Sequence, residues 1–234
     1  MLAYTSVTTS PNIIKELGRL PWRWMATPFI SHSAYTAMLK TGWSYALDNG
    51  AWGFRYSNEN KVRSISHEMG VTLDFKAKGS SQYDDNRFMW MVDKYGLNAD
   101  FIVIPDVVGD REATLEKAES WLPRLRGLKL VIAVQDRMLE RDIAPYLQKG
   151  VGIFIGGSTR WKVSKIPYWA GVARKWNVMC HCGRVNTERR IEMCRVNGID
   201  SFDGSGPSRW LKRSKELTDY LISKRGETPV VTGE

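Results

Sequence analysis

Short apolar runs alternate along this chain with longer amphipathic stretches. The runs are too short for stable helices, and several are rich in β-branched residues, which favours strands. We therefore predict strands at WSYAL (43–47), FIVI (101–104), LVIAV (130–134), GIFI (152–155), VMC (178–180) and DSF (200–202), with WMATPFI (24–30) as a further candidate.

The stretches between these runs carry apolar residues at helical spacing. In residues 110–125, Asp110 can cap the first turn, and one face is apolar through Leu115, Ala118, Trp121 and Leu122. Similar patterns predict helices over residues 84–96, 137–150, 159–176, 186–198 and 207–223. Because strands and helices alternate, the fold class is α/β with a parallel sheet, either a closed barrel or an open doubly wound sheet.

One segment interrupts this alternation. Residues 55–83 are polar and irregular, and we interpret them as an excursion or a lid rather than a domain boundary. The sequence contains no internal repeat, linker or low-complexity tract. We therefore expect a single domain over residues 1–234, with 224–234 as a flexible tail.

Composition limits the class of protein. The chain has 234 residues, of which 43% are hydrophobic, so it can bury a full core. No stretch approaches the roughly 20 apolar residues that span a bilayer, and no apolar block follows a basic start. The three cysteines, Cys180, Cys182 and Cys194, fit reduced thiols better than a disulfide framework. We expect a soluble protein of the cytoplasm without a membrane partner.

The net charge of +9 favours a polyanionic partner. Cationic residues cluster where predicted helices begin on the expected active face, and they can bind phosphates or form an ordinary solvated surface: Arg184, Arg189, Arg190, Arg209, Lys212, Arg213 and Lys215.

Polar residues collect directly after the predicted strands. They are Asp48-Asn49-Gly50-Ala51-Trp52, Pro105-Asp106, Gln135-Asp136, Gly156-Gly157-Ser158, His181 and Asp203-Gly204. In a parallel α/β barrel the carboxyl ends of the strands meet on one face, where such barrels carry their active sites. One aspartate at a strand end more often caps the next helix, but six strand ends of this kind favour a site.

The residue types at these ends suit chemistry on a glycosidic bond. Two carboxylates in one cleft can divide the work of nucleophile and acid/base. Asp106, Gln135 and the backbone N–H groups of Gly156 and Gly157 can read the edge of a flat heterocycle, and Trp52 can stack on its face. His181 can line the same pocket or act as a hydrogen-bonded structural histidine.

Five of these motifs carry a resemblance to a known family. YALDNGAW, IPDVVGD, AVQD, FIGGS and IDSFDG, in this order, resemble the tRNA-guanine transglycosylase superfamily, whose α/β barrels exchange guanine for a 7-deazaguanine. PDVVGD, GGSTRWK, GRVNTERRI and DSFDGSG are more similar to the DpdA-type transglycosylases, many of them from bacteriophages, which place 7-deazaguanines in DNA. The resemblance covers residues 43 to about 210.

This resemblance implies a small single (β/α) barrel of the TIM type and a role for each matched residue. Asp203 is then the nucleophile that attacks the anomeric carbon, and Asp48 is the proton shuttle for the leaving and incoming bases. The base pocket would be formed by Asn49, Trp52, Asp106, Gln135, Gly156 and Gly157, with His181 beside them.

Two departures from the family favour DNA over tRNA as the substrate. The tRNA enzymes hold a structural zinc with cysteines and a histidine after the nucleophile, but no Cys or His follows Cys194 here. The sequence after Asp203 is also too short for an added RNA-binding domain. We expect no metal and no cofactor, with DNA and a free base such as 7-cyano-7-deazaguanine as partners; a homodimer stays open.

Two other function classes remain as alternatives. One is a small-molecule glycosidase, nucleoside-processing or phosphate-binding barrel enzyme, for which a charge of +9 has little use. The other is a non-catalytic barrel that binds nucleic acid, against which the full set of matched carboxylates argues. If the gene belongs to a phage, the expected compartment is the host cytoplasm.

Overall fold

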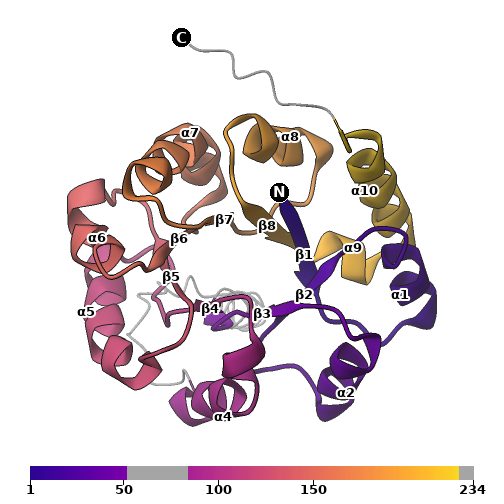
Figure 1. The fold of residues 1–234 in the computed structure, drawn as a ribbon, viewed down its shortest axis with the longest axis horizontal. Helices are drawn as coiled ribbons and strands as arrows, with labels where there is room; N and C mark the ends of the chain where they lie inside the picture. Colours follow the sequence, from indigo (N-terminus) through magenta and orange to yellow (C-terminus); the bar gives the residue numbers. More distant parts are fainter. Residues whose placement is uncertain (52–83, 227–234) are drawn as a thin grey trace, which may run out of the picture.

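The computed structural model describes residues 1–51 and 84–226. Within them, eight parallel strands form a closed barrel, so the predicted single (β/α) barrel is confirmed (Figure 1). The strands are β1 (Leu2–Ser6), β2 (Arg23–Ala26), β3 (Tyr45–Leu47), β4 (Ile102–Val103), β5 (Leu130–Val134), β6 (Gly152–Ile155), β7 (Cys180–Cys182) and β8 (Ser201–Gly204).

Helices surround the barrel as an outer ring (Figure 1). They are α1 (Pro11–Leu17), α2 (His32–Thr41), α4 (Asp85–Tyr95), α5 (Arg111–Trp121), α6 (Glu140–Leu147), α7 (Thr159–Trp176), α8 (Glu188–Val196), α9 (Gly206–Arg209) and α10 (Leu211–Ser223), with 3-10 turns η1 (Gly96–Asn98) and η2 (Leu122–Leu125). Asp110 caps α5 as predicted, because its carboxylate accepts a hydrogen bond from the Ala113 N–H at 3.0 Å. None of the described helices is long and apolar enough to cross a membrane.

The structure adds elements at the start of the chain that the sequence did not predict. β1, α1 and α2 were not predicted, and β1 closes the barrel by pairing with both β2 and β8. The predicted excursion at 55–83 lies outside the described residues, and so does the predicted tail beyond residue 226.

Strands β7 and β8 extend further toward their carboxyl ends than predicted. The Val178 N–H donates to the Ala173 carbonyl at 3.0 Å, so residue 178 belongs to the turn that follows the C-terminus of α7. The strand therefore begins at Cys180, which pairs with Ile153 of β6. Consequently His181 and Asp203, predicted to follow strands, lie inside them.

The apolar core has two layers. The larger layer fills the space between the strands and the helices. The smaller layer fills the barrel interior with side chains from most of the strands: Tyr4, Met25, Ala46, Phe101, Val103, Val131 and Ala133. This interior is packed rather than hollow, so a ligand has access only to the two ends of the barrel.

Candidate active site

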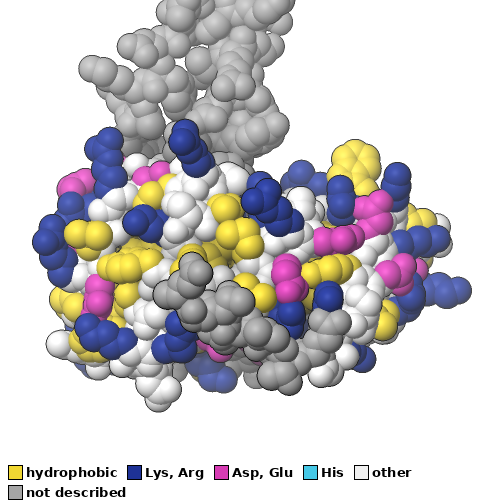
Figure 2. All heavy atoms as spheres, turned by 90° about the horizontal axis from the view of Figure 1, so that it is seen from above, with side chains coloured by type: hydrophobic (Ala, Val, Ile, Leu, Met, Phe, Trp, Pro, Cys, Tyr) yellow, Lys and Arg dark blue, Asp and Glu magenta, His cyan; other side chains and the backbone are white. Residues whose placement is uncertain are grey.

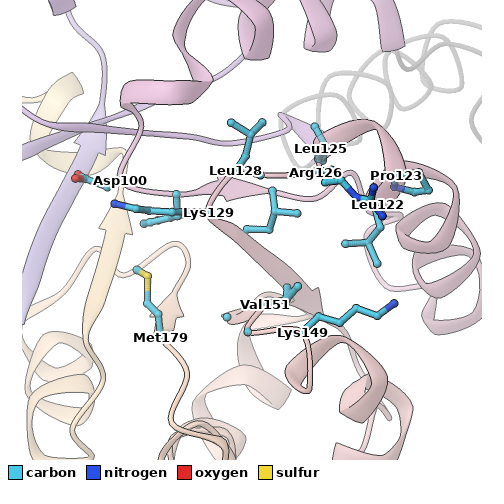
Figure 3. A pocket seen from close by; sticks show the side chains of 15 residues that line it. Asp100, Leu122, Pro123, Leu125, Arg126, Leu128, Lys129, Lys149, Val151 and Met179 are labelled. Carbon is cyan, nitrogen blue, oxygen red and sulfur yellow. The ribbon is translucent and has the colours of Figure 1, made fainter.

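A cavity of about 550 Å³ opens at the carboxyl ends of the strands. Its wall contains most of the predicted site: Asp48, Asn49, Asp106, Gln135, Gly156, Gly157, Arg184, Asp203 and Arg209. A larger cavity of about 690 Å³ lies at the opposite end of the barrel, among the loops that precede β4 to β7 (Figure 3). Since barrel active sites lie at the carboxyl ends of the strands, the smaller cavity is the candidate site.

Asp203 lies on β8 with one carboxylate oxygen held in place. Its Oδ1 accepts hydrogen bonds from His181 Nε2 at 3.0 Å and from the Arg184 backbone N–H at 3.3 Å. None of the described residues hydrogen-bonds its Oδ2. Because only 17% of this side chain is exposed, and it lines the cavity, Oδ2 is the oxygen that a ligand can meet.

His181 is a positioning residue behind Asp203 rather than a residue of the cavity wall. The ring is fully buried, stacks on Phe154 at 5.0 Å between centroids and has Tyr4 and Phe101 at its edges. Its Nδ1 lies 2.8 Å from Ser201 Oγ. When Asp203 is ionised, Nε2 must carry the proton, so the Ser201 hydroxyl donates to Nδ1. Of the two roles that the sequence left open for His181, the structure favours the hydrogen-bonded structural histidine, because the ring is buried behind Asp203 and does not line the cavity.

Asp48 follows β3 and lies in the same cavity as Asp203. Burial, together with the nearby charges of Asp203 and Asp106, raises the pKa of Asp48 to about 7. The backbone N–H groups of Gly50 and Asn49 partly oppose this shift. Because Asp48 titrates near neutrality, it can both donate and accept a proton there, which an acid/base group requires.

Asn49, Asp106 and Gln135 form one buried cluster on the cavity wall. Asn49 Nδ2 donates to Asp106 Oδ1 at 2.7 Å and to the Ile104 carbonyl at 2.9 Å, while Gln135 Nε2 donates to Asp106 Oδ2 at 2.5 Å. Burial raises the pKa of Asp106, although both amide hydrogen bonds act in the opposite direction. Asp106 and Gln135 therefore serve as structural partners of each other as well as lining the cavity.

The backbone N–H groups of the glycine loop, at Gly156 and Gly157, are also hydrogen-bonded within the protein. The Gly156 N–H donates to the Val134 carbonyl at 3.1 Å, and the Gly157 N–H donates to Gln135 Oε1 at 3.2 Å. These N–H groups therefore do not face the cavity as free donors, contrary to the expected role. A side chain at Gly157 would collide with Asp136 and Trp161, and its φ of +62° suits glycine, so the loop keeps the wall close to the cavity.

The predicted nucleic-acid-binding cations separate into two groups. Arg184 and Arg209 line the cavity, and the Arg184 guanidinium donates to the Gly157 carbonyl. Burial lowers the pKa of Arg184. The other group lies on α8 and α10, outside the cavity wall: Arg189, Arg190, Lys212 and Arg213. Arg213 forms an ion pair with Glu216 at 2.9 Å.

One aromatic residue of the cavity was not predicted as part of the site. Phe29 follows β2, lines the cavity and is 40% exposed. A side chain at Gly50 would meet the Phe29 ring at 2.7 Å, so the absent side chain leaves room for this ring. The sequence feature that could have indicated this position is the Thr27-Pro28 pair, which interrupts the apolar stretch 24–30 directly before Phe29. Trp52, the predicted stacking residue, lies outside the described residues.

Behind the site, α7 contributes a buried lysine. The Lys162 ammonium donates to the Gly183 carbonyl, and burial lowers the pKa of Lys162 to about 8. The three cysteines are buried free thiols, with Cys182 and Cys194 hydrogen-bonded to each other. Across residues 1–51 and 84–226, no group of three or more His, Cys, Asp or Glu side chains is arranged to hold a metal ion.

Comparisons with known proteins give a fold but no family. No model of a protein family matches the chain, and no curated protein does. A mandelate oxidase variant with an FMN adduct has a TM-score of 0.51 and 7% identity over 95% of this chain and 71% of its own. A flavocytochrome b2 variant with sulfite bound has a TM-score of 0.49 and 11% identity over 97% of this chain and 65% of its own. At such identities the likeness is one of barrel architecture alone.

Proposed function

We propose that this protein is a transglycosylase of the DpdA type, which exchanges guanine in DNA for a 7-deazaguanine base. The observation that carries the proposal is the pair of carboxylates, Asp48 and Asp203, in one cavity at the carboxyl ends of the barrel strands. Their surroundings differ, and such a difference assigns different roles to two carboxylates in one site.

In the first step, Asp203 Oδ2 attacks C1′ of the target nucleotide. The C1′–O bond forms as the C1′–N9 bond breaks, and the electron pair of the broken bond goes to the leaving guanine. Asp48 supplies the proton that the base takes up. The hydrogen bonds from His181 and Arg184 to Oδ1 keep Oδ2 oriented for the attack.

In the second step, N9 of the incoming base attacks C1′ and releases the Asp203 carboxylate. The N9 proton goes to Asp48, which restores the enzyme. Because no water is consumed, the cavity must keep water away from C1′ while the sugar is bound to Asp203. The guanine and the 7-deazaguanine share the same Watson–Crick edge, so one pocket can hold either base.

The buried cluster supports recognition of that edge. Each Asp106 oxygen accepts one hydrogen bond from a protein amide and has a second lone pair available. Guanine presents N1–H and N2–H donors, which a fixed carboxylate can accept. Asn49 and Gln135 hold the Asp106 carboxylate in one orientation, so they act as positioning residues.

The test is exchange of labelled guanine into matched DNA and tRNA, with metal content measured on the same preparation. We expect exchange into DNA, and a covalent adduct between the sugar and Asp203 detected by mass spectrometry. Faster exchange into tRNA, or dependence on stoichiometric zinc, would return the protein to the RNA-modifying branch. Hydrolysis of small glycosides without base exchange would instead support the small-molecule alternative.

A further inference from the structure

Two aromatic side chains are exposed in or next to the cavity wall: Phe29 lines the cavity, and Trp210 directly follows the lining residue Arg209 in the sequence. Trp210 is 67% exposed although it is the largest type of apolar side chain, and Phe29 is 40% exposed. Trp210 lies between α9 and α10, directly after Arg209 of the cavity wall. Burial of such side chains is favourable, so exposed aromatic residues next to a cavity are typical of a binding surface.

A cation lies beside the Phe29 ring, and cationic residues flank Trp210 in the sequence. The Arg87 guanidinium lies 5.8 Å from the centroid of the Phe29 ring. Trp210 follows Arg209 and precedes Leu211 and Lys212 in the sequence, and Leu211 is itself 39% exposed. Neither Arg209 nor Lys212 forms an ion pair with any residue of the described ranges, whereas the adjacent Arg213 does.

The two aromatic–cation sets are Phe29 with Arg87, and Trp210 with Arg209 and Lys212. They belong to different parts of the barrel. Phe29 follows β2, and Arg209 follows β8, yet both line the cavity that contains Asp48 and Asp203. Figure 2 views the side of the barrel with α7, α8 and α10, and it shows hydrophobic side chains beside Lys and Arg at the right of the upper edge. Phe29 and Arg209 therefore connect both sets to the same cavity wall.

We propose that Trp210 and Phe29 are stacking platforms for the bases that flank the target nucleotide in an unpaired strand. Arg209 and Lys212 bind the phosphates of the same strand. Aromatic faces combined with cations are how proteins hold single-stranded nucleic acid without reading its sequence. An acidic peptide would use the cations but has no bases to stack. The inference rests on the proposed function, since it places the target base in the cavity between the platforms.

The experiment measures binding of a labelled single-stranded DNA of about 12 nucleotides, and of its duplex, by fluorescence anisotropy with the full chain. Trp210→Ala should weaken single-strand binding by about 5–150-fold, the range for loss of one base stack. It should leave the salt dependence unchanged, whereas Arg209→Gln should reduce the slope of log Kd against log salt by about one. Phe29→Leu, which keeps bulk over Gly50, should weaken binding without loss of the fold.

Leu97→Ala is the matched control, because Leu97 is 86% exposed on η1 at the opposite end of the barrel. It should bind single strands as the parent does. Parent-like binding by Trp210→Ala, or tighter binding of the duplex than of the single strand, would overturn the inference. The inference would also be overturned if Trp210→Ala reduced binding to anionic lipid vesicles but left binding to DNA unchanged.

Failure of this inference can be separated from failure of the proposed function. If the parent exchanges guanine in DNA but Trp210→Ala binds DNA equally well, only the stacking platforms are refuted. If the parent neither binds nor modifies DNA at low salt, the proposed function fails, and the platforms fail with it.

Discussion

The carboxylates at the two ends of the barrel have different neighbours. At the amino end, Asp100 accepts hydrogen bonds from Arg23 at 2.8 Å and from the Tyr4 hydroxyl at 2.9 Å. At the carboxyl end, Asp48, Asp106 and Asp203 share one cavity, and burial with mutual repulsion raises the pKa of Asp48 to about 7. Asp100 at the amino end is paired with a cation, whereas Asp48 at the carboxyl end faces two further carboxylates.

The surroundings of these carboxylates are a better guide to the functional site than the volume of the cavity is. The larger cavity is at the amino end, lined by apolar residues and by cations such as Lys149 and Arg126 (Figure 3). Carboxylates in mutual repulsion reduce stability, and proteins retain such arrangements mostly at functional sites. The comparison therefore assigns chemistry to the smaller cavity and stability to the amino end.

The largest expected effect is at Asp203. Asp203→Asn keeps the size of the side chain but removes the nucleophilic charge, so base exchange should fall by several orders of magnitude. The measurement is labelled-guanine exchange into DNA. Asp100→Asn, which changes a carboxylate at the other end of the barrel, should keep the parent's rate. An Asp203→Asn protein with a tenth of the parent's rate would refute the covalent role.

The second effect is at Asp106. Asp106→Ala should weaken uptake of the free 7-deazaguanine base by roughly tenfold to 150-fold, because a buried, charge-assisted hydrogen bond is worth about 1.5–3 kcal/mol. Calorimetry with the free base measures it. Since Asn49 and Gln135 lose their shared acceptor in this variant, its thermal unfolding must be compared with that of Gln135→Ala. Parent-like affinity in a folded variant would contradict the assignment.

The third effect is on stability and depends on pH through Asp48. Its folded-state pKa of about 7 lies above the ordinary carboxyl value of 3.8, so the folded state binds more protons between these pH values. Stability should therefore fall as pH rises through this window. Asp48→Asn removes the penalty and should be more stable than the parent at pH about 8, by on the order of 4 kcal/mol.

Denaturant unfolding at several pH values tests this prediction. The difference between Asp48→Asn and the parent should vanish as pH falls below about 3, where the parent carboxyl is neutral in both the folded and the unfolded state. A constant difference at all pH values would show that Asp48 does not titrate as inferred. The exchange activity of this variant should be lost, because an amide cannot shuttle the proton.

The smallest effect is at His181. His181→Phe keeps an aromatic ring among Tyr4, Phe101 and Phe154 but removes the hydrogen bond to Asp203. We expect kcat to fall about tenfold, as for loss of one hydrogen bond of about 1–1.5 kcal/mol, with unchanged affinity for the free base. Ser201→Ala should cause a smaller loss in the same direction. Weakened base affinity in His181→Phe would place the histidine in the pocket after all.

The sequence predicted the parts of the site that depend on local pattern. Strand ends are marked by a change from apolar to polar residues, so Asp48, Asp106, Gln135 and Asp203 were located correctly in the cavity wall. The first 41 residues were harder, because β1 is short, mixes Thr and Ser with apolar residues, and becomes a strand only through pairing with β2 and β8.

Contacts between distant residues could not be predicted from local pattern. The Asn49–Asp106 hydrogen bond joins residues 57 positions apart, and the Gln135–Asp106 bond joins residues 29 positions apart. The position of His181 depended on a strand boundary that the neighbouring strand β6 determines. Exposure of Phe29 and Trp210 is likewise a property of the folded surface, since both look like core residues in the sequence.

Closure of the barrel has a consequence for folding. Tyr4 pairs with Asp203 in the register of β1 and β8, and Thr5 Oγ1 donates to the Gly204 carbonyl at 2.8 Å across 199 positions of sequence. A loop of this length must close before the strand that carries Asp203 is paired on both sides, and such long-range contacts slow folding. Asp48, Asp106 and Gln135 are synthesised long before Asp203, so a nascent chain holds the proposed acid/base and base-binding residues before it has the proposed nucleophile. Under the proposed function, catalytic competence is therefore acquired last, when the final strand pairs with the first.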